Sequence, residues 1–280
     1  TSFQEPRKMD ICVISYVHLG TYGCQAKELA KYLKSIDPDT LILNGDIIDI
    51  WQFKKRYFPK SHFRVIHLLM KFMSKGKRVV YITGNHDEML RKFDGETLGN
   101  LEICNKLVLE HNNEKLWFFH GDVFDVTMQH SKWIAQLGSI GYDLLILLNS
   151  FVNWWCLKLG KEKLSLSKKI KNSVKGAVKF INNFEQIAAN IAIENGYDRV
   201  ICGHIHHPEI KTLSNDKGAV TYMNSGDWVE NLSALECVNG EWSVYTFNPD
   251  EMGKEEPPVS KVELKNKELF QAMVSEFSKS

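Results

Sequence analysis

Five short polar motifs recur along the chain, and each directly follows an apolar run of the kind that forms a β-strand. In α/β sheets the carboxyl ends of neighbouring strands meet at one edge, where ligands bind. We therefore expect the five motifs to converge on a single site. They are Tyr16-Val17-His18, Gly45-Asp46, Gly84-Asn85-His86-Asp87, His120-Gly121-Asp122 and Gly203-His204-Ile205-His206.

The apolar runs are short and rich in β-branched and aromatic residues. Amphipathic helical patterns separate the early runs, and they cover residues 25–36, which stop at Asp37-Pro38, and residues 62–74, which stop at Gly76. Strand and helix alternation predicts an α/β fold with a largely buried sheet. The predicted strands are residues 11–15, 41–44, 78–83, 116–119, 199–202, 220–224 and 242–247.

A long stretch without strand signals interrupts this alternation and predicts a helical insertion. Its first half is aromatic and aliphatic, and its second half is rich in lysine. Two interpretations stay open: a helical subdomain that extends the core, or a lid with an apolar slot and a basic rim. A lid of this composition suits an acyl chain joined to a diphosphate, and it suits docking to an anionic membrane leaflet. The expected domains are a core of residues 9–125 and 196–250, a helical lid of residues 126–195, and a C-terminal amphipathic helix or tail of residues 251–280.

The bulk composition narrows the class of partner and compartment. A formal net charge of +1 gives no global argument for nucleic acid, and lysine is concentrated in the insertion rather than across the core, so no nucleic-acid partner is predicted. The six cysteines are scattered without a C-x-x-C pair, which disfavours a disulfide framework or a thiolate zinc site. The polar first ten residues predict no secretory signal, and residues 139–160 are too polar for a good membrane span. We expect a cytoplasmic protein with peripheral contact at the inner face of the cytoplasmic membrane.

Histidine, aspartate and asparagine are the nitrogen and oxygen ligands of two-metal hydrolytic centres. Two cations neutralise phosphate oxygens and lower the pKa of water, which is most of what phosphoryl transfer requires. A Gly-Asp pair after a strand is usually only a turn, and a lone histidine is usually structural. The five motifs in this order are hard to explain as turns, so together they predict a metal centre that acts on phosphoesters.

The motif order resembles that of the calcineurin-like metallophosphoesterases, D-x-H, G-D, G-N-H-D, H-G-D and G-H-x-H, over about residues 9–247. The resemblance implies a four-layer α/β/β/α sandwich with a helical cap insertion. It implies two divalent metals, Mn²⁺ first, with Fe and Zn as alternatives. The implied ligands are His18 and His206 for the first metal, Asp46 as the bridge, and Asn85, His120 and His204 for the second metal.

The same resemblance implies catalytic roles for two further residues. His86 would donate a hydrogen bond or proton near the scissile phosphate, and Asp87 would orient His86. Tyr16 occupies the position of the usual aspartate ligand, and a neutral phenol is a poorer ligand than a carboxylate. Three accounts of Tyr16 stay open: a phenolate ligand to ferric iron, a weakened first site with reduced activity, or an introduced change in an otherwise ordinary enzyme.

Within the family, the chain resembles the diphosphatases that act on UDP-2,3-diacylglucosamine in lipid A synthesis. The resemblance lies in residues 45–51 (GDIIDIW) and in the helical insertion, although that group often carries Arg in place of His86. It implies a lipid-linked nucleotide sugar as the substrate and UMP and a lipid sugar 1-phosphate as products. It places Asn85, Asn172 and Lys175 against the substrate. The alternatives are a phosphoesterase for a soluble phosphomonoester or nucleotide, and a non-catalytic lipid-binding protein.

Overall fold

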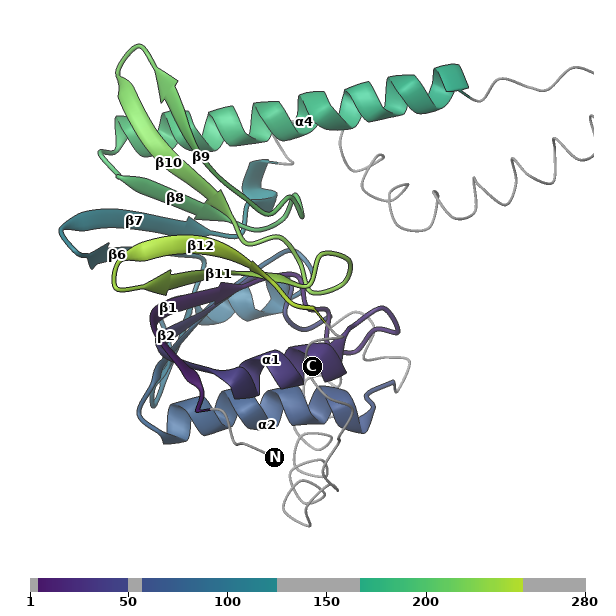
Figure 1. Cartoon of the computed structure of the whole chain (residues 1–280), viewed down its shortest axis with the longest axis vertical. Helices are drawn as coiled ribbons and strands as arrows, with labels where there is room; N and C mark the ends of the chain where they lie inside the picture. The colour runs from purple at the N-terminus through teal and green to yellow at the C-terminus, as the bar shows by residue number, and fades with distance from the viewer. Residues whose placement is uncertain (1–4, 50–56, 125–166, 249–280) are drawn as a thin grey trace, which may run out of the picture. The chain divides into compact units, whose positions relative to one another are not determined.

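The computed structural model of the chain describes residues 5–49, 57–124 and 167–248 (Figure 1). The chain divides into two compact units, residues 1–121 with 189–280, and residues 122–188. The helices are α1 (Ala26–Ser35), α2 (Lys60–Ser74) and α4 (Ser167–Glu194), with short 3₁₀ turns η2 (Glu88–Phe93) and η3 (Asp122–Phe124). The strands are β1 (Arg7–Ile14), β2 (Ile36–Asn44), β3 (Arg78–Ile82), β4 (Thr97–Leu98), β5 (Leu101–Cys104), β6 (Lys106–His111), β7 (Glu114–Phe119), β8 (Arg199–Cys202), β9 (Glu209–Asn215), β10 (Gly218–Asn224), β11 (Ser233–Val238) and β12 (Glu241–Thr246).

The described strands form two sheets that are flanked by helices. One sheet has the order β12-β11-β1-β2-β3-β5-β4, and the other has the order β6-β7-β8-β10-β9. Helices α1 and α2 cover the outer face of the first sheet (Figure 1). The end of α4 packs on the β9–β10 hairpin, where Asn190 and Glu194 contact Asn215 and Lys217. The predicted α/β sandwich with helices on its outer faces is therefore confirmed.

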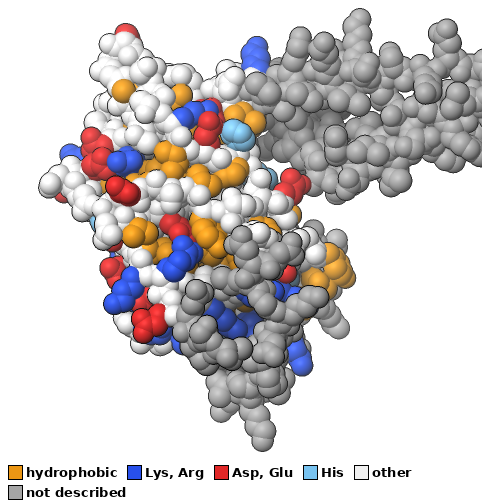
Figure 2. Space-filling view, viewed as in Figure 1, with side chains coloured by type: hydrophobic (Ala, Val, Ile, Leu, Met, Phe, Trp, Pro, Cys, Tyr) orange, Lys and Arg blue, Asp and Glu red, His pale blue; other side chains and the backbone are white. Residues whose placement is uncertain are grey.

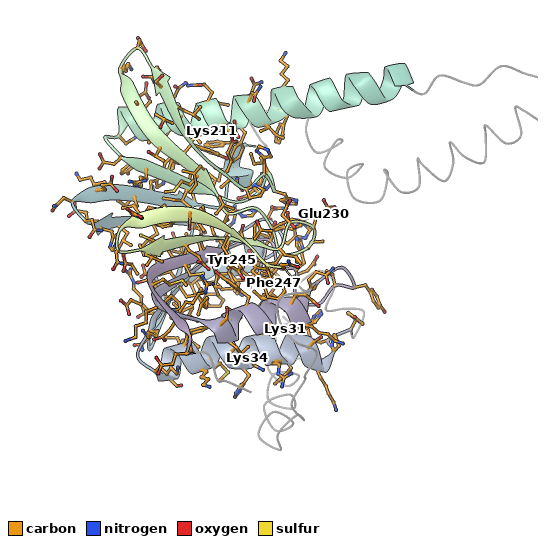
Figure 3. All side chains as sticks on the ribbon, viewed as in Figure 1. Lys31, Lys34, Lys211, Glu230, Tyr245 and Phe247 are labelled. Carbon is orange, nitrogen blue, oxygen red and sulfur yellow. The ribbon has the colours of Figure 1, made fainter. Side chains whose placement is uncertain are left out.

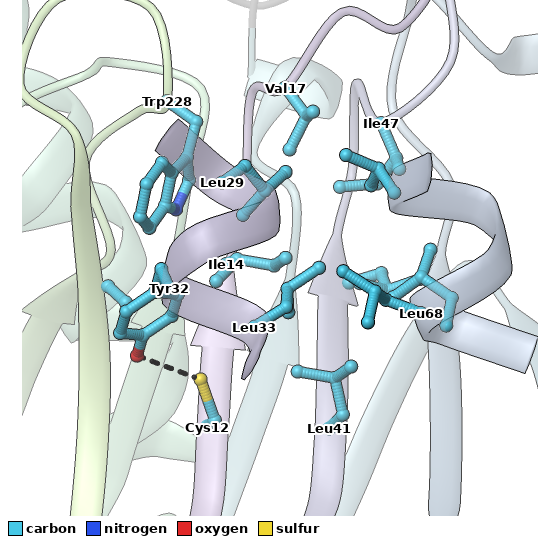
Figure 4. Close-up of a cluster of buried hydrophobic side chains, with 14 of the residues drawn as sticks. Cys12, Ile14, Val17, Leu29, Tyr32, Leu33, Leu41, Ile47, Leu68 and Trp228 are labelled. Carbon is cyan, nitrogen blue, oxygen red and sulfur yellow. Dashed lines mark hydrogen bonds between the residues drawn. The ribbon is translucent and has the colours of Figure 1, made fainter. Parts of the chain in front are cut away.

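The carboxyl-terminal halves of β1 and β2 and nearly all of β3 are buried on both faces, which explains why these parts read as continuous apolar runs (ICVI, LIL and VVYI). Successive side chains alternate between two cores, as the pleat requires. Ile14, Leu41 and Leu43 point to α1 and α2, where they meet Leu29, Leu33 and Trp228 (Figure 4). Val13, Ile42 and Val80 point to the second sheet and form the core between the sheets. The register of this sheet is thus fixed from both sides.

Polar groups tie α1 to this core. Tyr32 is fully buried on α1, and its hydroxyl lies 3.3 Å from Cys12 Sγ (Figure 4) and donates to Glu236 at 2.8 Å. Arg7 binds the same Glu236 carboxylate through two hydrogen bonds. The Tyr32 ring also stacks on Tyr245 of β12. Figure 3 labels Tyr245 and, on α1, Lys31 and Lys34. Because every partner is satisfied, this buried network fixes α1 on the sheet.

All seven predicted strands are present, and the described chain contains further strands. The first helix was predicted to stop at Asp37-Pro38, and α1 ends at Ser35, just before these residues. Both residues lie in β2, which begins five positions before the predicted strand. Pro38 is tolerated because β2 pairs only with β1 there, and its pairing with β3 begins at Thr40. Strands β4, β5, β6, β9 and β11 were not predicted. β4 and β5 are very short, and the burial patterns of β6 and β9 are mixed. β11 (SALECV) is buried but has only one β-branched residue, so its strand signal is weak.

Each of the five motifs follows the carboxyl end of a strand in a parallel pair. Strands β1, β2 and β3 run parallel to one another in the first sheet, and β7 and β8 run parallel in the second. Figure 3 labels Glu230 in the loops at this end of the strands. The predicted convergence of the motifs on one edge therefore has its physical cause in the parallel pairing.

The described surface shows no dominant sign of charge on the face drawn in Figure 2, where Lys and Arg lie among Asp and Glu. Among the described helices, none is long and apolar enough to cross a membrane. Residues 139–160, the apolar half of the insertion and the predicted C-terminal helix lie outside the described residues. The location and membrane contact of the chain stay predictions.

A buried histidine connects α2 to the loop that follows β1. His62 is 2% exposed, and its Nδ1 accepts a hydrogen bond of 2.9 Å from the backbone N–H of Gly20. An accepting Nδ1 requires the neutral ring. Burial lowers the pKa of His62 to about 4.

We expect this histidine to make the stability of the chain pH-dependent. In the unfolded chain the ring has its usual pKa near 6.5, so between about pH 6.5 and 4 the unfolded state binds one proton more than the folded state. The free energy of unfolding should therefore fall as pH is lowered through this window, by on the order of 3 kcal/mol. Urea unfolding between pH 7.5 and 4 measures the effect. His62→Gln should flatten the profile, and His67→Gln, on the same helix but only partly buried, should leave it steep.

Candidate metal centre

Asp46 stands at the centre of the converging loops. Its side chain is 1% exposed, Oδ1 accepts a 2.9 Å hydrogen bond from the backbone N–H of His86, and Oδ2 lies 3.2 Å from Nε2 of His120. Burial would raise the pKa of this carboxyl group, but the imidazoles of His120, His18 and His86 outweigh burial and hold the pKa well below its usual range. A buried carboxylate that stays ionised is what a cation requires of a ligand.

Two groups of potential ligands share this carboxylate. His18, Asp46 and His86 form one group, and Asp46, His120 and His204 form the other, and in each group the ligand atoms lie within 4.8 Å of one another. Within the described part of the chain, His18 Nε2 and Oδ1 of Asn85, in the loop beside His86, are buried and have no hydrogen-bond partner. Buried polar atoms without partners are costly, and a cation would satisfy them. The residues therefore fit two cations joined by Asp46.

The backbone at the site is strained. Tyr16, His18, Asp46, His204 and His206 all have φ between 52° and 56°, the left-handed region that costs a side-chain-bearing residue roughly 1–2 kcal/mol. Hydrogen bonds between the loops hold these conformations: Tyr16 N–H donates to Gly45, His18 N–H donates to Asp46, and Gly203 N–H donates to His120. Strain of this kind persists only where the surroundings over-determine it, and it gathers at functional sites.

Two glycines allow the loops to approach Asp46 closely. A Cβ at Gly84 would collide with the Asp46 carboxylate, and a Cβ at Gly45 would collide with the ring of His120. Neither neighbour can move away, because both are fully buried ligand-type side chains. Glycine is therefore required in both motifs for the loops to close around the carboxylate.

Asp49 orients two of the imidazoles. Its Oδ2 lies 3.3 Å from Nδ1 of His18 and 3.2 Å from Nδ1 of His86, and the residue is 4% exposed. Burial opposes ionisation of Asp49, but its hydrogen bonds with His18 and His86 lower the pKa of the carboxyl group. With Nδ1 held in this way, both rings keep Nε2 for a cation or a substrate. Sequence reasoning missed this residue, although it stands three positions after Asp46 in the quoted GDIID run.

His120 is held in the same manner from the second sheet. Its Nδ1–H donates to the backbone carbonyl of Asn44 at 3.0 Å, and its Nε2 faces Asp46. The ring of His204 lies edge-on at 5.1 Å between centroids. A backbone carbonyl on Nδ1 is a common way to fix the tautomer of a metal-binding histidine.

Asp87 has a different role from the expected one. It was expected to orient His86, but its carboxylate accepts hydrogen bonds from Tyr81 Oη, Ile47 N–H and Gly84 N–H. Asp87 is fully buried, and burial together with the charge of Asp46 raises its pKa. It therefore fixes the turn that carries Asn85 and His86, while Asp49 is the carboxylate bonded to the His86 ring.

His206, expected as a first-metal ligand, lies outside both groups of ligand atoms among the described residues. Its ring packs against Tyr16, with 3.5 Å between centroids, and the Tyr16 ring also meets His18 edge-on at 4.0 Å. Burial lowers the pKa of His206 to about 4. Burial, followed by the charges of Asp46 and Asp227, raises the pKa of the Tyr16 phenol, so the ring sits in the site as a neutral aromatic group.

The two remaining predicted substrate residues lie on α4. Asn172 and Lys175 belong to the part of that helix whose side chains are outside the described residues. Their expected contact with the substrate stays a prediction.

Comparison with known proteins decides the family. A family model described as calcineurin-like phosphoesterase matches residues 9–208 of the chain. The chain belongs to this family. Its members are metal-dependent hydrolases, in agreement with the ligand groups around Asp46. The matched range includes all five motifs.

The relatives with assigned names are distant but extend over most of the chain. The UDP-2,3-diacylglucosamine hydrolase of Aliivibrio fischeri is 24% identical over 76% of this chain and 86% of its own length. The UDP-2,3-diacylglucosamine hydrolase of Aeromonas salmonicida is 22% identical over 83% of this chain and 91% of its own length. Among solved structures, an archaeal phosphodiesterase covers 85% of this chain and 99% of its own, at 15% identity and a TM-score of 0.39.

The site geometry makes Asp49 testable as a positioning residue. Asp49→Asn keeps the shape of the side chain but removes the charge that holds the two imidazoles, so the affinity of the chain for Mn²⁺ should fall by about 10- to 100-fold. Equilibrium dialysis measures this affinity. Asp39→Asn, on the same strand-to-loop segment but with a side chain that is 79% exposed, is the control and should bind as the unchanged chain does. Equal affinity in all three proteins would contradict the role given to Asp49.

Proposed function

We propose that the chain hydrolyses the diphosphate of UDP-2,3-diacylglucosamine, or of a similar lipid-linked nucleotide sugar, to UMP and a lipid sugar 1-phosphate. The observation that carries the proposal is the pair of ligand groups that share buried Asp46. The choice of substrate is supported by the names of relatives that align over most of their length. The proposed cofactor is two divalent cations, Mn²⁺ or, as alternatives, Fe and Zn.

The reaction adds one water across the diphosphate. The oxygen of the water bonds to one phosphorus, the bond from that phosphorus to the bridging oxygen breaks, and the bridging oxygen leaves on the other phosphate. Two bound cations would supply positive charge to the phosphate oxygens and make water acidic enough to attack near neutral pH. Asp46 would bridge them, with His18 on one side and His120, His204 and Asn85 on the other.

His86 is placed to act on the substrate as well as on a cation. Its side chain is 36% exposed, whereas His18 and His120 are almost fully buried, so the His86 ring borders the open side of the centre. Burial lowers the pKa of His86, but its hydrogen bond with Asp49 and the charges of Asp46 and Asp49 outweigh burial and raise the pKa. A raised pKa favours the protonated ring, and a protonated ring suits a donor to the oxygen of the departing phosphate.

Tyr16 is proposed to reduce the activity of this centre. It offers a protonated phenol where a carboxylate would add a negative ligand, and its ring occupies the space between His18 and His206. The first cation would then be held by fewer anionic groups, and its affinity would be lower. This is the second of the three accounts open from the sequence.

The test is release of UMP from UDP-2,3-diacylglucosamine in the presence of Mn²⁺, Fe²⁺ or Zn²⁺, measured for the unchanged chain and for Tyr16→Asp. The aspartate variant should be faster by about tenfold or more, which corresponds to roughly 1.4 kcal/mol of transition-state stabilisation. Tyr16→Phe is the matched control, because it keeps the ring without adding a ligand, and it should behave as the unchanged chain does.

Two outcomes would overturn parts of this proposal. If no form releases UMP but all hydrolyse a simple phosphodiester such as bis(p-nitrophenyl) phosphate, the phosphoesterase chemistry stands and the substrate is wrong. If Tyr16→Asp is no faster than Tyr16→Phe, the missing carboxylate does not limit the reaction.

A further inference from the structure

A second cluster of metal-ligand side chains lies away from the site at the strand ends. Asp10 on β1, His111 at the end of β6 and Cys237 on β11 place one ligand atom each within 4.8 Å of one another. Asp10 Oδ2 lies 3.3 Å from His111 Nε2 and 3.8 Å from Cys237 Sγ, and Sγ lies 3.8 Å from His111 Nε2. The three atoms form a nearly equilateral triangle.

The triangle is small enough for one ion to reach all three atoms. The point in the plane of the triangle that is equidistant from its corners lies about 2.1 Å from each atom, and Zn²⁺ binds oxygen, nitrogen and sulfur at about 2.0–2.3 Å. A tetrahedral ion lies above this plane, so an inward shift of Cys237 Sγ by a few tenths of an ångström (about 0.3 Å) would complete the coordination. We propose that Asp10, His111 and Cys237 form a Zn²⁺ site that is separate from the centre around Asp46.

The ligand types select the ion. A thiolate and an imidazole favour zinc over manganese or magnesium, which prefer oxygen. One thiolate and one carboxylate together neutralise the charge of a divalent ion. The side chains of Asp10 and His111 are 28% and 25% exposed, so water can reach the fourth position. The positive charge of Arg199 acts to lower the pKa of Cys237 and so favours the thiolate. The Arg199 side chain itself donates two hydrogen bonds to Glu114.

The surroundings already hold the ligands in place. The backbone N–H of Gly240 donates to Asp10 Oδ2 at 2.9 Å, as an outer partner of a ligating carboxylate does. Cys237 is fully buried, and burial raises the pKa of its thiol to about 11. The thiol is therefore protonated at neutral pH, and binding of the ion would release its proton.

The position of the cluster suggests what the ion does. The turn between β6 and β7 contains Asn112, and the turn between β11 and β12 contains Gly240. The two turns are in contact: a Cβ added at Gly240 would collide with the side chain of Asn112. In Figure 1 both turns lie at the opposite end of the sheets from the carboxyl end of β1. An ion here would tie β1 and β11 of one sheet to β6 of the other. Its role would be to hold the two sheets together. Asp10 lies about 13 Å along β1 from Ile14, the last residue of the strand before the first motif.

Cobalt substitution distinguishes the two sites. Among the described residues, the centre around Asp46 offers nitrogen and oxygen ligands, whereas the second cluster offers the thiol of Cys237. A thiolate-to-cobalt charge-transfer band in the near ultraviolet that depends on Cys237 therefore reports the second site. The chain, freed of metal with a chelator and then titrated with Co²⁺ under reducing conditions, should develop this band. Asp46→Asn should keep the band while losing cobalt from the other centre.

Cys237→Ser should lose the band and about one equivalent of cobalt per chain, and Cys24→Ser, a half-buried thiol elsewhere, is the matched control that should keep both. If Cys237→Ser does not fold, His111→Gln keeps the thiol and should weaken cobalt binding at this site at least tenfold. Absence of the band from the unchanged chain at saturating Co²⁺, or its persistence in Cys237→Ser, would overturn the proposal.

Discussion

The site depends on one buried charge. Asp46 is almost without solvent, yet it stays ionised because imidazoles from three different loops surround it. An isolated carboxylate in that position would be too costly, so the loops that bring His18, His86 and His120 are as necessary to the fold as they are to the chemistry. Closing five loops around this group requires glycine at positions 45 and 84, several residues in the left-handed region of φ, and parallel strands that end at the same edge.

The framework of this arrangement was predictable because it rests on local patterns. Apolar runs buried on both faces of a sheet leave a strong signal, and β1, β2, β3, β7 and β8 were all predicted from it. Strands β6 and β9 form hairpins that are largely exposed, and their alternation is too weak to separate them from loops. Asp37-Pro38 ends the first helix as predicted, but the sequence did not show that β2 begins before Pro38. Proline is tolerated there because β3 does not pair with that part of β2, and this pairing depends on the tertiary structure.

The chemistry was predictable only where it is written as motifs. His18, Asp46, Asn85, His120 and His204 follow strand ends in a recognisable order, and the side chains of the three histidines lie around Asp46. The roles of Asp49 and Asp87 could not be assigned in this way. Both lie near His86 in the sequence or the fold, and only the direction in which each side chain points shows which carboxylate contacts the His86 ring. The Asp10, His111 and Cys237 cluster leaves no spacing signal, since its members lie far apart in the sequence and meet only when the two sheets pack.

Tyr16 has a consequence for the kind of metal that the centre would prefer. Manganese is favoured by sites rich in carboxylate and water, whereas zinc and iron accept a larger share of imidazole. With a neutral ring at position 16, the proposed ligands contribute one shared carboxylate, the amide of Asn85 and three imidazoles, from His18, His120 and His204. The charge of two divalent cations would then be balanced by a single anionic ligand. Such a centre would depend more on the anionic substrate itself for neutralisation, and a carboxylate at position 16 would favour the proposed manganese more than the phenol does.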